Sequence, residues 1–203
     1  MEDRLRDPTA LDPSQRAAAT FGFGMAAMIM TVLGFSWLGW GFASLGWFTP
    51  ALWILFYSVT LCLLTATIRA LRKGKALMKV YAANSDEFWA KHGKQFKIIT
   101  VLEGAGCGVV VLLTIFFHRL DLLAAGISLV VGLHFLPLAR LLRFNVYYWS
   151  GGAIILCDLL IVLLFNALSI TASVGTATGV ILWATALYAL LRSVRFSRET
   201  ATA

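Results

Sequence analysis

The first candidate for chemistry is a carboxylate within an apolar run, because Glu103 lies in VLEGAGCGVVVLL, residues 101–113. An ionised carboxylate in hydrocarbon is costly unless it faces water, an opposite charge or a protonatable group. Glu103 follows Lys97 by six residues, and six helical residues span about 9 Å. His134 precedes Arg140 by the same six residues in another apolar run, so its imidazole is expected at the same depth. We predict that Glu103 and His134 meet at a site for protons or a polar solute, with a purely structural pair as the alternative.

Other apolar runs also carry polar side chains. Asp158 is an acid in one of them. A second set shares one helix face because its members recur at intervals of four, three and four residues. Its members are Ser58, Cys62, Thr65 and Arg69. We predict that Asp158 and this set, Cys62 aside, are further candidates for the substrate or proton site. Ordinary packing of small hydroxyl groups is the alternative.

Residue spacing also predicts where helices approach one another. The face that carries Glu103 continues through Cys107, Val110 and Thr114. Two glycine pairs have the small-xxx-small spacing of close helix contacts. These pairs are Gly104 with Gly108 and Gly175 with Gly179. Pro137, three residues after His134, is expected to kink its helix and open space beside the pair.

Sequence motifs of several enzyme classes do not occur in the chain. HExxH, GxSxG, paired CxxC and the Walker lysine loop are all missing from the sequence. GAGCG follows no predicted strand, so it is not read as a nucleotide loop. The three cysteines are an odd number within apolar runs, which argues against a disulfide framework. We predict no catalytic residue, no metal and no cofactor, and a non-enzymatic role is favoured.

The elements that must position these residues follow from composition. Hydrophobic residues make up 60% of the 203 positions and charged residues only 13%, which predicts an all-α, polytopic integral membrane helix bundle. Apolar runs long enough to cross about 30 Å of hydrocarbon predict six transmembrane helices. Their expected ranges are 17–40, 50–69, 98–117, 122–139, 147–169 and 173–191, the last two separated near ITAS.

The distribution of positive charge predicts the orientation. With six spans, all but one of the 17 lysines and arginines fall on the same side of the membrane, and Arg119 is the exception. Because basic residues near helix ends are retained in the cytoplasm, we predict that the N and C termini are cytoplasmic. The expected location is the cell membrane, the inner membrane if the source is a bacterium. The domains predicted are a cytoplasmic segment 1–16, one six-helix domain 17–191 and a cytoplasmic tail 192–203.

A basic segment, 69–97, is expected to form a cytoplasmic helical hairpin within this domain. Its first half is predicted to continue the second helix, and Asn84 with Glu87 resembles a capping box that begins the third. Basic and aromatic residues in it are candidates for binding anionic lipid headgroups. The candidates are Arg72, Lys73, Lys75, Lys79, Trp89, Lys91, Lys94 and Lys97. The alternative is that these charges only enforce the topology.

Two classes of function remain open. The first is a small transporter or channel-like protein that handles protons or a solute near the cytoplasmic side. The second is a noncatalytic scaffold or sensor whose hairpin binds anionic lipid or a partner protein. A lipid-modifying enzyme ranks third because no nucleophile accompanies the pair. The expected partner is the lipid bilayer, nucleic acid is set aside, and either a homo-oligomer or a membrane partner is compatible with the sequence.

Overall fold

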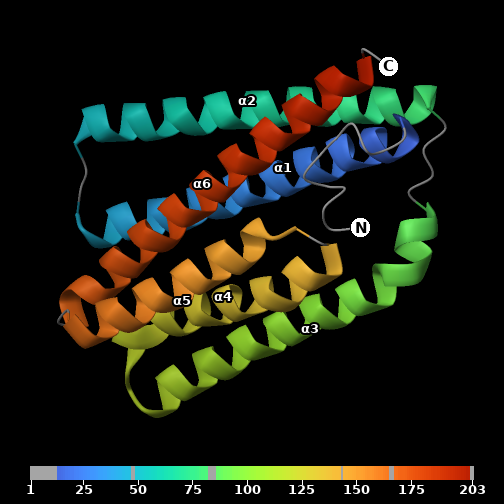
Figure 1. Cartoon of the computed structure of the whole chain (residues 1–203). Coiled ribbons are helices and arrows are strands. Elements are labelled where there is room, and N and C mark those ends of the chain that lie inside the picture. The colour runs from blue at the N-terminus through green and yellow to red at the C-terminus, as the bar shows by residue number, and fades with distance from the viewer. Residues whose placement is uncertain (1–12, 47–48, 82–85, 143, 165–166, 202–203) are drawn as a thin grey trace. The chain divides into compact units, whose positions relative to one another are not determined.

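The computed structural model consists of α-helices joined by short connections (Figure 1). It describes residues 13–46, 49–81, 86–142, 144–164 and 167–201, without the side chains of 86–92, 167–169 and 201. The elements are α1 (Pro13–Ser44), α2 (Pro50–Val80), α3 (Asp86–Phe116), the 3-10 turn η3 (Leu120–Leu122), α4 (Leu123–Leu142), α5 (Val146–Leu164) and α6 (Ala167–Ala201). All six α-helices are long and apolar enough to cross a membrane, so the predicted all-α class and the six apolar helices are confirmed, while their crossing of a membrane stays a prediction.

The helices of the basic segment agree with the sequence pattern on both sides of the connection. α2 continues to Val80, well past its apolar part, as predicted. α3 begins at Asp86, so the basic residues before the third span are also helical. Asn84 of the predicted capping box lies outside the described residues. The hairpin arrangement of the two helices stays a prediction.

The boundary between the last two spans differs from the prediction. We expected a break near ITAS, but α5 ends at Leu164 and α6 already begins at Ala167. Thr171 and Ser173 are therefore helical residues of α6. Hydroxyl side chains can bond to a carbonyl of the preceding turn, so serine and threonine do not interrupt a membrane helix as they would interrupt an exposed one.

The chain divides into two compact units, each described here by itself. Unit 1 comprises Met1–Val32, Ile54–Lys91 and Trp183–Ala203, and unit 2 comprises Leu33–Trp53 and His92–Leu182. Both α1 and α6 contribute segments to each unit. The predicted single domain over 17–191 stays a prediction.

Unit 1 is held together by contacts of α2 and α6 with the first part of α1. The Phe23 and Phe196 rings join α1 to α6, with centroids 5.4 Å apart. Gly74 of α2 lies against the backbone of Phe21, where an added Cβ would be 2.8 Å from the Phe21 Cα. Glycine at this position allows α1 and α2 to approach closely.

Unit 2 includes extensive packing between α4 and α5, which lie side by side in Figure 1. A Cβ added to Gly151 would lie 2.6 Å from the Gly132 carbonyl oxygen, so the two backbones are in direct contact. The stacked rings of Phe135 and Tyr147, 5.3 Å apart, fill the space beside this contact. α4 therefore forms a fixed support for the polar residues of this unit.

Candidate functional site

The face of α3 that carries Glu103 packs against α4. A Cβ added to Gly126 of α4 would meet the Val110 side chain of α3, and a Cβ added to Gly106 of α3 would meet the Val130 side chain of α4. Thr114, two turns beyond Cys107 on this face, is buried and its hydroxyl donates to the Val110 carbonyl. The predicted stripe on α3 is thus a packing face. The short connection through η3 returns the chain as the antiparallel neighbour α4.

Glu103 and His134 are brought together at this interface. The Oε2 atom of Glu103 lies 3.4 Å from Nδ1 of His134. The His134 side chain is 10% exposed and that of Glu103 27%, so the carboxylate is the member nearer to the surroundings. The Nδ1 atom is buried and has no hydrogen-bond partner with favourable geometry among the described residues. The contact is an ion pair when the imidazole is protonated.

Pro137 lies inside α4, one turn after His134. It has no backbone N–H to donate to the carbonyl of Leu133, which directly precedes His134. α4 nevertheless remains helical as far as Leu142. The pair therefore sits beside a backbone carbonyl that the helix itself does not satisfy, while the predicted kink stays a prediction.

Asp158 belongs to a different polar group within unit 2. Its side chain is buried, and neither carboxyl oxygen has a hydrogen-bond partner among the described residues. The Ser128 hydroxyl of α4 faces this carboxyl without meeting hydrogen-bond geometry. Ser128 in turn shares a 2.7 Å hydrogen bond with Thr178 of α6. Sequence reasoning missed both hydroxyl residues, since no spacing pattern connects them with Asp158.

The polar stripe on α2 lies on an exposed face of that helix in unit 1. Ser58, Thr65 and Arg69 are all exposed, and the Thr65 hydroxyl donates to the Leu61 carbonyl of its own helix. The buried side of α2 instead carries residues such as Phe56. These three candidates are therefore on the face of α2 that does not pack within unit 1.

The candidate lipid-binding residues are exposed wherever their side chains are described. On α2 these are Arg72, Lys73, Lys75 and Lys79, and on α3 they are Lys94 and Lys97. The side chains of Trp89 and Lys91 lie outside the described residues. Exposure leaves the charged groups available to headgroups, and it is equally compatible with a purely topological role.

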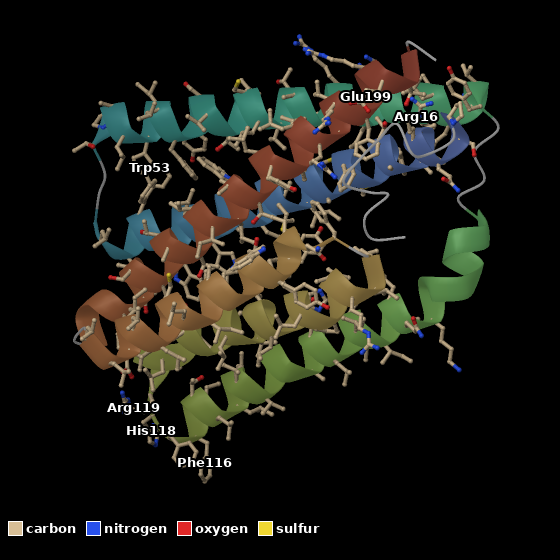
Figure 2. The ribbon with its side chains drawn as sticks, in the orientation of Figure 1. Arg16, Trp53, Phe116, His118, Arg119 and Glu199 are labelled. Atoms are coloured by element: carbon tan, nitrogen blue, oxygen red, sulfur yellow. The ribbon has the colours of Figure 1, made fainter. Side chains whose placement is uncertain are left out.

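Unit 1 contains a polar contact that the sequence reasoning did not identify. Arg16, at the start of α1, donates to the backbone carbonyl of Glu199 near the end of α6 over 2.8 Å, and the two residues lie close together in Figure 2. The Ser193 hydroxyl also donates to the Thr20 carbonyl. The first bond satisfies a carbonyl in the last turn of α6, and both bonds tie α6 to α1, which indicates a structural role.

The two predicted glycine pairs have different outcomes. Gly175 and Gly179 make close contacts with α1, where added Cβ atoms would lie 2.8 Å from the Gly41 Cα and 2.5 Å from the Leu38 Cγ. The prediction for Gly104 and Gly108 is wrong within unit 2, because none of its described atoms lies within 4 Å of a Cβ added to either glycine. Each is one residue removed from the packing face, and one residue corresponds to a rotation of about 100°.

Comparison of the chain with protein-family models, with curated proteins and with solved structures gives no match. The functional argument consequently depends on the geometry of the polar residues described above.

Proposed function

We propose that this chain is a multi-pass protein of the cell membrane that handles protons, or a small polar solute together with protons, at Glu103 and His134. The observation that carries the proposal is the 3.4 Å approach of an acid and an imidazole inside two apolar helices. Ionisable residues in such helices commonly mark ion, proton or substrate paths. The distribution of lysine and arginine supports cytoplasmic termini, and with that orientation the pair lies near the cytoplasmic boundary.

The chemistry available to the pair is reversible proton binding. Both side chains can gain and lose a proton, and the imidazole has two ring nitrogen atoms that can each donate or accept a hydrogen bond. The partly exposed Glu103 provides the connection to water, while the more buried His134 lies deeper in the α3–α4 interface. A proton or a hydrogen-bonding solute that enters from the cytoplasmic side would reach the carboxylate first.

The test is proton-coupled flux in liposomes that contain the purified full-length protein. An imposed pH gradient should produce protein-dependent movement of protons, read with a pH-sensitive dye inside the vesicles. Glu103→Gln should abolish this movement while the protein remains folded, because an amide preserves the shape of the side chain but does not exchange a proton at neutral pH. His134→Gln should have the same effect.

The matched control is Glu199→Gln, the same chemical change at a half-buried acid in unit 1 that pairs with Arg195. It should leave the flux unchanged. Equal loss in both glutamate variants would contradict a specific role for Glu103. If the wild-type protein shows no flux with or without a pH gradient, the second candidate is favoured: a scaffold or sensor, supported by the exposed basic residues at the end of α2.

A further inference from the structure

Unit 2 contains an acid that plays no part in the Glu103–His134 pair. Asp158 is 3% exposed on α5, and both of its carboxyl oxygens are buried. Among the described residues it forms no ion pair, since the ion pairs found there join other side chains. An ionised carboxylate in such surroundings requires a compensating positive charge.

A buried pair of hydroxyl groups from two other helices of unit 2 includes one group, Ser128, that lies beside this acid. Ser128 of α4 is fully buried, Thr178 of α6 is 1% exposed, and their oxygens are 2.7 Å apart. Ser128 also faces the carboxyl of Asp158. The Ser128 hydroxyl therefore connects the carboxyl of Asp158 with the hydroxyl of Thr178. Four side-chain oxygen atoms from three helices belong to this one polar group of unit 2. Hydroxyl dipoles orient around a charge, but they cannot neutralise that of the carboxylate.

The set of donor atoms limits which cation could supply the missing charge. All four atoms are oxygens, the ligands of hard metal ions, and the described residues contain no cluster of three or more histidine, cysteine or acidic side chains. One carboxylate balances a single positive charge, so a divalent ion would leave a net charge in apolar surroundings. A small monovalent ion without its water shell suits both the oxygen ligands and the single negative charge. Some membrane transporters coordinate Na⁺ with oxygen atoms in this way.

We propose that Asp158, Ser128 and Thr178 bind a dehydrated sodium ion inside unit 2. The carboxylate neutralises the ion, and the two hydroxyl oxygens provide further ligands. Because the three residues come from α4, α5 and α6, bound Na⁺ links these helices and stabilises the folded protein. This site is independent of the proposed proton handling at Glu103.

The experiment measures the thermal unfolding midpoint, Tm, of the full-length protein in detergent while NaCl replaces choline chloride at constant ionic strength. A ligand that binds only the folded state raises its stability in proportion to ln(1 + [Na⁺]/Kd). The Tm of the wild type should therefore rise by about 2–4 °C or more for a protein of this length. Asp158→Asn, which keeps the size of the side chain, should remove the dependence on Na⁺.

Thr178→Val tests the site without changing its charge. It should raise the Kd for Na⁺ about tenfold, so that about ten times more NaCl is needed for the same rise in Tm, as expected for the loss of one ligand. Thr114→Val is the matched control, because the hydroxyl of Thr114 bonds within α3. It should leave the response to Na⁺ unchanged even where it shifts Tm.

Three results would overturn the proposal: a wild-type Tm that is equal in NaCl and choline chloride, a Na⁺ response that persists in Asp158→Asn, or a Tm that responds to pH but not to Na⁺. The last result would identify a proton as the bound cation. Failure of the liposome flux experiment does not affect these measurements, because unfolding does not depend on transport.

Discussion

Two acids in the same unit of this protein have different surroundings and are expected to do different work. Glu103 is partly exposed and lies 3.4 Å from an imidazole, so two groups that can each bind a proton are adjacent. Asp158 is buried beside the Ser128 hydroxyl and has no histidine, lysine or arginine partner among the described residues. The first arrangement suits proton exchange, and the second suits retention of a cation.

At the residue scale, the approach of Glu103 and His134 predicts chemical crosslinking. In a background that lacks the native cysteines, Glu103→Cys combined with His134→Cys should react efficiently with a short bifunctional thiol reagent. The physical reason is that both side chains extend into the same part of the α3–α4 interface. The product is measured by mass spectrometry after proteolysis between α3 and α4, as two fragments that stay joined by the crosslink.

The control pair is Gly104→Cys with His134→Cys. Position 104 is the next residue on α3, and no atom lies within 4 Å of a Cβ placed there. Its crosslinking should be several-fold weaker at equal labelling of both thiols. Similar yields from the two pairs would show that the face of α3 turned to α4 is not the one carrying Glu103.

At the element scale, the helices use glycine selectively, and only some of this could be predicted from sequence. Gly175 and Gly179 were found by spacing, and both contact α1. Gly104 and Gly108 have the same spacing but point away from α4, whereas Gly106 packs against Val130. Small-xxx-small spacing shows that two glycines share a face, but it does not show which face is covered.

These contacts predict opposite effects of the same substitution at two glycines. Gly175→Ala should lower the free energy of unfolding by about 1–3 kcal/mol, because the added methyl would lie 2.8 Å from the Gly41 backbone. Relief of this contact would require the α1 and α6 backbones to move apart. Gly104→Ala should be neutral or stabilising by up to about 1 kcal/mol, since alanine favours a helix and space is open there. Denaturant titration in detergent measures both, and equal losses would contradict the packing of α1 on α6.

The sites show the same division between what a sequence can and cannot predict. Depth along a span follows from the flanking basic residues, so the contact of Glu103 with His134 could be anticipated. Ser128 and Thr178 could not, because hydroxyl residues are common in apolar helices and many bond within their own helix, as Thr114 does. Nothing in the spacing distinguishes a hydroxyl that faces an acid. The helix boundary near ITAS was misplaced because serine and threonine can also bond within a helix and need not end it.

At the scale of the whole molecule, charge and helix ends agree on one topology. The α3–α4 connection contains Arg119, the single basic residue predicted on the external side, and Figure 2 shows it with Phe116 and His118 beside the end of α3. Arg119 is bound by both carboxylate oxygens of Asp121, with its Nη2 2.9 Å from Oδ2. Hydrogen bonds with Asp121 raise the pKa of the Arg119 guanidinium above its ordinary value. One arginine on the external side is a small exception to the strong excess of basic residues on the other side.

The topology prediction is that reporter fusions alternate sides at the helix ends of the structure. Fusions after Gly46, Asp121 and Leu164 should report an external location, and fusions after Val80 and Leu142 a cytoplasmic one. The physical reason is that lysine and arginine cluster at the second group of ends and are nearly missing from the first. Paired phosphatase and fluorescent-protein reporters measure both sides, since the first is active outside and the second inside. An external signal after Val80, where the basic end of α2 is exposed, would reverse the orientation and place Glu103 near the outer boundary. Proton handling at Glu103 would then begin from the opposite side of the membrane.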